Sequence, residues 1–291
     1  MLVLVVVAVL SLTAGGAAAW GVRRWPQADP AAAASRSLEG EMIRWGRVRR
    51  FLRSRLDPAT ITGLALSVAL LAVILGGVAL GVVVYMIRTD SGVVRIDQAV
   101  ARWAADHVEG VSFDVLGVLT VLGSTPAIVV LATATALSAM RQHRGFSTAG
   151  FLTLVVGGQF LMSNLIKFAV ERVRPDLGHF GALGTPSFPS GHATAAAATF
   201  AALALILGRD RSPAERAVLA GAGVAIAVAV GSSRALLGVH WFSDVVSGLL
   251  LGWTWFAICA VAFGGRLLWY GAPVEEAASS ASKARSMGSS T

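Results

Sequence analysis

Long apolar stretches without any charged residue are the feature that most limits how this chain can fold. About 20 such residues are enough for one helix to cross a lipid bilayer. The stretches recur along the whole chain, at 1–22, 58–87, 115–140, 145–166, 193–208, 217–233 and 245–265. Those at 193–208 and 217–233 are short, and they reach the thickness of a bilayer only with their polar ends included.

These stretches predict an all-α, polytopic membrane helix bundle. They are too long for the strands of a membrane barrel, and they lack the alternation of apolar and polar residues that such strands need. Only 14% of the residues are charged, whereas a soluble domain averages about 25%. Small residues such as Gly76, Gly157 and Gly221 recur inside the stretches and suit close contacts between helices in lipid.

The basic residues indicate how the helices are oriented. The formal net charge is +8, but the arginines lie between the apolar stretches rather than on one face, which argues against nucleic-acid binding. Because basic loops favour the cytoplasm, we expect the following elements on that side: 44–55, 141–144, 209–216 and Arg266. The loops 88–114, 167–192 and 233–244 then face the outside.

The alternation of apolar stretches and basic segments also divides the chain into four parts. We predict an N-terminal transmembrane anchor over 1–22, a basic cytoplasmic linker over 23–57, a helical domain over 58–266 and a disordered cytoplasmic tail over 267–291. The segment "AGGAAAW" also resembles the cleavage site of a signal sequence, but no basic residues precede the apolar stretch. We therefore favour an uncleaved anchor whose N-terminus lies outside.

The segment "VVRIDQAVARWAADHV" (93–108) carries apolar residues at helical spacing. This predicts an amphipathic helix lying at the membrane interface, and we expect it to cover the ends of the other helices. His107 at its end is not expected to belong to a site. The single cysteine, Cys259, lies in an apolar stretch and is interpreted as a small core residue.

Three segments of the outer loops carry charged or titratable residues that could bind a ligand. The first is "KFAVERVRP" (167–175). Lys167 and Arg174 share one face if the helix continues between them, and Pro175 discourages helix beyond that point. Two cations on one face suit an anionic ligand. The simpler interpretation is that both side chains only extend to lipid head groups as anchors.

The second segment is "SFPSGHAT" (187–194). Ser190 is a natural N-cap for the helix that follows, and Gly191 allows a ligand to approach the backbone. The free N–H groups and the dipole at such a helix end favour an anion, and His192 would stand beside it. A capped helix with an interfacial histidine is the simpler alternative.

The third segment is "SRALLGVHWFSD" (233–244). Arg234 offers a planar guanidinium that can hold two phosphate oxygens. His240 and Asp244 lie four residues apart and face the same way on a helix, so the carboxylate can fix the tautomer of the imidazole. Taken alone, this is equally well explained as an interfacial pair whose hydrogen bonds are satisfied.

Together, the motifs "K-x6-RP", "PSGH" and "SR-x5-H-x3-D", with "LGSTP" (122–126) before them, resemble those of the type 2 phosphatidic acid phosphatase (PAP2) superfamily. The resemblance covers roughly residues 60–266. It implies a six-helix core, to which 1–22 would add an extra N-terminal helix. It also implies an extracytoplasmic active site without a metal or other cofactor.

The resemblance further implies roles for the motif residues. His240 would be the nucleophile that forms a phosphohistidine, Asp244 would orient it, and His192 would protonate the leaving oxygen and then activate water. The phosphate would be held by Lys167, Arg174, Ser190, Gly191 and Arg234. The implied substrates are lipids with a phosphate or pyrophosphate head group, such as phosphatidic acid, phosphatidylglycerol phosphate or undecaprenyl pyrophosphate.

Other functions remain open at this point. The same pocket would serve a lipid phosphotransferase, and membrane-embedded charges also occur in transporters of lipids or anions. A zinc hydrolase would use His179, His192, His240 and Asp244, but these residues lack the spacing of helical zinc motifs. Three neighbouring cations would also repel a divalent ion.

Overall fold

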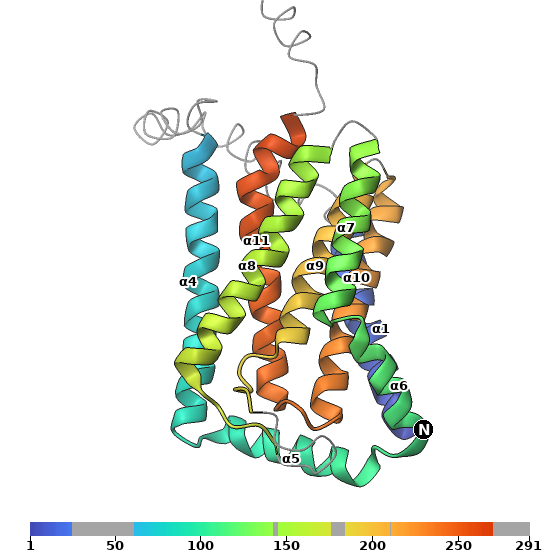
Figure 1. Ribbon diagram of the computed structural model, residues 1–291, viewed down its shortest axis with the longest axis vertical. Helices are drawn as coiled ribbons and strands as arrows, with labels where there is room; N and C mark the ends of the chain where they lie inside the picture. Colours follow the sequence, from blue (N-terminus) through green and yellow to red (C-terminus); the bar gives the residue numbers. More distant parts are fainter. Residues whose placement is uncertain (25–60, 142–144, 176–183, 210, 270–291) are drawn as a thin grey trace, which may run out of the picture.

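The computed structural model describes residues 1–24, 61–141, 145–175, 184–209 and 211–269, which form nine α-helices and their connections without any strand (Figure 1). Side chains are described for all of these except 61–73, 145–147 and 261–269. Most of the predicted linker and tail, together with His179, lie outside the described residues. Within them, the predicted all-α architecture is confirmed.

Six of the predicted apolar stretches each form one helix. These are α1 (Leu2–Arg24), α4 (Ile61–Arg88), α8 (Gly145–Val170), α9 (Gly191–Leu207), α10 (Pro213–Leu236) and α11 (Phe242–Trp269). In the described part of the chain, four helices are long and apolar enough to cross a membrane alone, or up to six if each bent pair forms one span. The bundle is therefore that of a multi-pass membrane protein.

The apolar stretch at 115–140, which is predicted to form one membrane helix, is divided into two helices. The chain forms α6 (Gly110–Val121) and α7 (Thr125–Arg141), which meet at an angle of 46°. Gly123 lies at the break, where a Cβ atom would come within 2.5 Å of Val230 Cγ1 and 3.0 Å of the His192 carbonyl oxygen. The close approach to α9 and α10 therefore requires glycine at this position.

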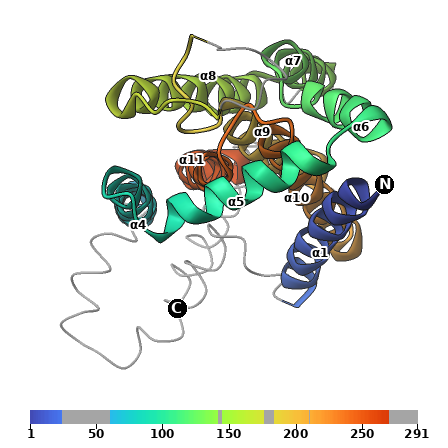
Figure 2. The ribbon, with the colours of Figure 1, turned by 90° about the horizontal axis from the view of Figure 1, so that it is seen from below.

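Helix α5 (Gly92–His107) lies across one end of the bundle, at 78° to α4 (Figure 2). It is the amphipathic helix expected over 93–108. Its buried face contains Ala101 and Ala104, and also Asp97, which is almost completely buried. A buried carboxylate needs hydrogen-bonding or charged partners, so α5 does more than cover apolar helix ends.

Helix α9 lies at the centre and packs against α10 and α11. Its inner face is largely alanine and is fully buried. Residues 248 and 252 of α11 are glycines. A Cβ atom added at position 252 would lie 2.4 Å from the carbonyl oxygen of Thr194, and a Cβ atom added at position 248 would lie 2.6 Å from the carbonyl oxygen of Ser190. Glycine at both positions lets α11 touch the backbone of α9 at the end that begins with Ser190.

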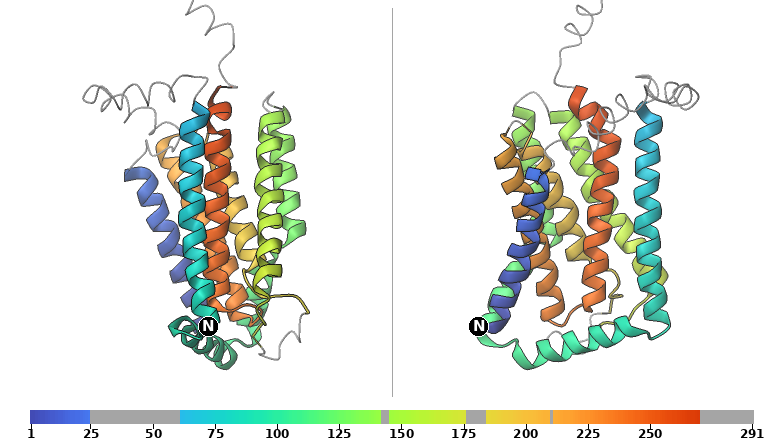
Figure 3. Two further views of the ribbon diagram at one scale, coloured as in Figure 1. Left: turned by 90° about the vertical axis from the view of Figure 1, so that its left-hand side faces the viewer. Right: turned by 180° about the vertical axis from the view of Figure 1, so that it is seen from behind.

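Helix α1 packs along α10 (Figure 3). Its buried residues, Val3, Val7, Ser11 and Gly15, form one stripe at a spacing of four. Gly15 and Gly221 meet directly, because a Cβ on either would lie 2.6–2.7 Å from the carbonyl oxygen of the other. Such contacts between small residues are a usual way for membrane helices to associate.

We expect Gly15→Leu to destabilise the bundle by about 1–3 kcal/mol, because the new side chain must displace the backbone of α10. Gly16→Leu is the matched control, since a Cβ at position 16 meets no atom within 4 Å. Thermal unfolding in detergent measures both. Equal melting temperatures for the two variants would contradict the packing of α1 on α10.

Candidate functional site

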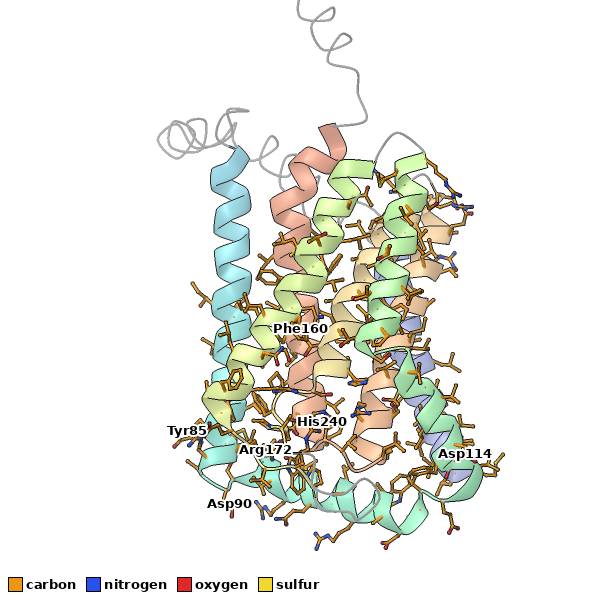
Figure 4. The ribbon with its side chains drawn as sticks, in the orientation of Figure 1. Tyr85, Asp90, Asp114, Phe160, Arg172 and His240 are labelled. Atoms are coloured by element: carbon orange, nitrogen blue, oxygen red, sulfur yellow. The ribbon has the colours of Figure 1, made fainter. Side chains whose placement is uncertain are left out.

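The three candidate ligand-binding segments, 167–175, 187–194 and 233–244, meet at the end of the bundle that α5 crosses. Arg172 and His240 lie close together there (Figure 4). Lys167 is in the last turn of α8, Ser190 and Gly191 begin α9, and the segment from Arg234 to Asp244 joins α10 to α11. His192 is the second residue of α9, close enough to Arg234, His240, Lys167 and Arg174 for their charges to act on its ring. The structure thus brings together all the residues predicted for the site.

The helix does not continue from Lys167 to Arg174, so these two residues do not share a helix face. Helix α8 ends at Val170, and Glu171 adopts the left-handed backbone conformation with φ of 50°. Arg174 precedes Pro175, which disfavours helical geometry at that residue. Arg174 therefore reaches the site from the loop rather than from the helix.

The guanidinium of Arg174 connects two loops. Its Nε donates to the Thr185 carbonyl oxygen at 2.9 Å, and its Nη1 donates to that of Val239 at 2.6 Å. The same Nη1 lies 3.3 Å from Nε2 of His240. Arg174 thus stands beside Nε2 of the His240 imidazole and fixes the loop that carries it.

His240 is 3% exposed, and its Nδ1 lies 3.6 Å from Oδ2 of Asp244. With Arg174 as donor to Nε2, the proton of a neutral ring is on Nδ1 and faces the carboxylate. Burial lowers the pKa of His240 to about 4, although Asp244 opposes this effect. At neutral pH the imidazole is therefore uncharged, and the lone pair of Nε2 faces the Arg174 guanidinium.

Asp244 is fixed by further contacts. Its Oδ2 accepts the backbone N–H of Trp241 at 3.0 Å. Its Oδ1 accepts from Nη1 of Arg172 at 2.6 Å, and Nη2 of Arg172 donates to Oδ2 of Asp97 at 2.7 Å. Sequence reasoning missed Arg172 and Asp97 as parts of the site.

One signal could have identified Asp97. It lies four residues before Ala101 and seven before Ala104, on the face that the amphipathic pattern assigns to the interior. An acidic residue there needs a buried partner. Arg172 lies between the motif residues Lys167 and Arg174, but no spacing links it to Asp97.

Ser190 occupies the predicted N-cap position of α9, but its side chain makes no capping hydrogen bond. Its Oγ and the Nε of Arg234 are buried and have no hydrogen-bond partner among the described residues. Nη1 of Arg234 donates to Oγ1 of Thr120 at 2.9 Å. Buried polar groups are normally paired, so these two groups point to a polar ligand.

The ligand that suits this site is an anion with several oxygens. A Cβ on Gly191 would lie 3.9 Å from Nζ of Lys167, so the lysine stands beside the first N–H groups of α9. Lysine, two arginines and a helix N-terminus together favour phosphate. Among the described residues, no three His, Cys, Asp or Glu side chains form a group that could hold a metal ion.

Comparisons with known proteins agree with this chemistry. The PAP2 superfamily profile matches residues 148–267. A lipid A 1-phosphatase from Rhizobium johnstonii is 38% identical over 118 residues, which cover 37% of this chain and only 43% of that protein. A decaprenylphosphoryl-5-phosphoribose phosphatase from Mycobacterium tuberculosis is 36% identical over 142 residues, covering 47% of this chain and 72% of that protein.

A solved structure is also similar. The transmembrane PAP2-type phosphatidylglycerolphosphate phosphatase from Bacillus subtilis superposes with a TM-score of 0.58 at 27% identity. The match covers 72% of this chain and 96% of that protein. The similarity therefore extends well beyond the motif segments and into the bundle that supports them.

We expect the His240 ring to remain neutral until the pH falls to about 4, well below the usual value of about 6.5. Histidine-labelled protein in detergent, followed by nitrogen NMR, measures this, and His240→Ala identifies the signal. In Asp244→Asn the pKa should fall further, because the carboxylate raises it. A titration near 6.5 in the wild type would contradict the burial of this ring.

Proposed function

This chain belongs to the PAP2 superfamily, and we propose that it is a phosphatase that hydrolyses the phosphate or pyrophosphate head group of a membrane lipid. One observation carries the proposal: a buried, neutral His240 holds Nε2 beside the Arg174 guanidinium and Nδ1 toward Asp244. The whole cluster lies at the end of the helix bundle that α5 crosses, which is where the head group of a membrane lipid would be expected.

The phosphate would be held by electrostatics and hydrogen bonds. We assign Lys167, Arg174 and Arg234 to its oxygens, together with the Ser190 hydroxyl and the backbone N–H of Gly191. Phosphoryl transfer requires mainly positioning and stabilisation of charge. The buried donors on Ser190 and Arg234 that lack partners support this assignment.

In the first step, Nε2 of His240 attacks phosphorus and a phosphorus–nitrogen bond replaces the bond to the leaving oxygen. The negative charge of the bound phosphate would offset the cations that surround His192 and keep this ring protonated. His192 then donates a proton to the leaving oxygen, so the lipid leaves as an alcohol or, from a pyrophosphate, as a monophosphate. The positive charge that develops on His240 faces the Asp244 carboxylate, which stabilises it.

In the second step, water attacks the phosphohistidine. His192 is now neutral and takes a proton from this water, while the phosphorus–nitrogen bond breaks and His240 regains its lone pair. Inorganic phosphate then leaves. This step returns His192 to its protonated state, so the enzyme is ready for the next substrate and the cycle consumes only one water molecule.

We place the site on the extracytoplasmic side. Arg209, Arg211 and Arg216 lie where α9 ends and α10 begins, at the opposite end of the bundle from α5, and basic loops favour the cytoplasm. The N-terminus of α1 lies at the same end as α5 (Figure 1). The proposed substrate is thus a lipid of the outer leaflet, of the phosphatidic acid, phosphatidylglycerol phosphate or undecaprenyl pyrophosphate type.

The central test is phosphate release from these three lipids in detergent containing EDTA. We expect activity on at least one, and a loss on the order of 1,000-fold or more for His240→Ala, because the nucleophile is gone. Binding of a phosphate analogue should survive the change. Loss of wild-type activity on chelation would count against the mechanism.

The same assay separates the other functions. A phosphotransferase would consume the lipid without releasing phosphate and would need an added acceptor alcohol. A transporter without phosphohistidine chemistry would tolerate His240→Asn, whereas the proposed enzyme would not.

His192→Gln should affect the two steps differently. With p-nitrophenyl phosphate the leaving group needs no proton, so the phosphoenzyme should still form while its hydrolysis slows. A burst of nitrophenol followed by a slow phase, and an acid-labile, base-stable phosphoprotein, are the expected results. His240→Ala is the control that should show neither. Equal rates for wild type and His192→Gln would remove His192 from the mechanism.

A further inference from the structure

We infer that Asp97 and Arg172 form a positioning pair through which α5 sets the orientation of Asp244 and, through it, of His240. This inference rests on the proposed function, because it assigns a purpose to the orientation of the catalytic imidazole. Neither residue is placed at the phosphate. Both act through Asp244.

The geometry of Arg172 carries the inference. Its planar guanidinium lies between two carboxylates, with Nη1 at 2.6 Å from Oδ1 of Asp244 and Nη2 at 2.7 Å from Oδ2 of Asp97. The side chain of Arg172 is 10% exposed, and those of both aspartates are fully buried. The Trp241 ring lies 5.3 Å from Cζ of Arg172 and further restricts the guanidinium.

Ser243 completes the cluster. Its Oγ accepts from Nη1 of Arg172 at 2.8 Å and donates to Oδ2 of Asp97 at 2.6 Å. Its backbone N–H donates to Oδ1 of Asp97 at 2.8 Å. Since Ser243 is in the first turn of α11, Asp97 satisfies a free N–H of that helix from another helix. The start of α11, including Asp244, is thereby fixed to α5.

The two oxygens of Asp244 have different partners as a result. Oδ1 is held by Arg172, which leaves Oδ2 to face Trp241 N–H and Nδ1 of His240. If Arg172 were released, the carboxylate could rotate and Oδ2 would no longer be directed at the imidazole. A misplacement of about 1 Å in such an arrangement can cost about 100-fold in rate.

This arrangement predicts that the pair affects the chemical step rather than phosphate binding. The cations assigned to the phosphate are Lys167, Arg174 and Arg234, and Arg172 is committed to the two carboxylates. Weakening the pair should therefore lower kcat while the inhibition constant of inorganic phosphate, the reaction product, stays close to that of the wild type.

The test compares Ser243→Ala, Asp97→Asn and Arg172→Lys. Ser243→Ala is the mildest, since it removes one hydroxyl and no charge. A lysine at 172 keeps the charge but cannot bridge both carboxylates. The controls are Asp106→Asn and Arg102→Gln, which alter exposed side chains on α5, the helix that carries Asp97. We measure kcat, the inhibition constant of inorganic phosphate and the melting temperature in detergent for each.

We expect kcat to fall by up to about 100-fold in Asp97→Asn and Arg172→Lys, and less in Ser243→Ala, with inhibition by inorganic phosphate unchanged. The inference is overturned if kcat in these variants equals that of the controls, or if inhibition by phosphate weakens in parallel with kcat. If the charge variants do not fold, Ser243→Ala decides. A wild type that hydrolyses no lipid would instead refute the proposed function.

Discussion

The close approach of α9 to α10 and α11 is the constraint on which the site depends. Glycines at 248 and 252 bring α11 against the backbone of α9, and Gly223 brings α10 close to the carbonyl of Phe200. In lipid there is no hydrophobic force between helices, so such tight packing is what holds them together. It aligns the N-terminus of α9 with the ends of α10 and α11, where the functional side chains lie.

The second constraint is the cost of burying charge. Cations and carboxylates gather at one end of the bundle, and each buried ion there needs a partner. The carboxylates find theirs in Arg172, whereas Arg234 keeps a buried donor without a partner in the described chain. A site with unused positive donors in a medium of low dielectric constant is well prepared for an oxyanion.

The sequence was sufficient for features that depend on local pattern. Apolar length predicted the membrane helices, and the motif residues from Lys167 to Asp244 come together as expected. Features that depend on distant contacts were not predictable. Pro175 disfavours helix at Arg174, but nothing near Glu171 shows that the helix already ends at Val170. Asp97 and Arg172 are 75 residues apart. Gly123 is visible in the sequence, but its bend results from neighbours on other helices.

The bend at Gly123 limits which substitutions this chain can accept during evolution. Any side chain at position 123 would press on Val230 and on the carbonyl oxygen of His192, so a substitution there would shift the backbone of a residue assigned to proton transfer. Related chains that replace this glycine would have to adjust the neighbouring helices at the same time. Position 123 and its surroundings on α9 and α10 should therefore vary together during evolution, although residue 123 has no chemical group to contribute.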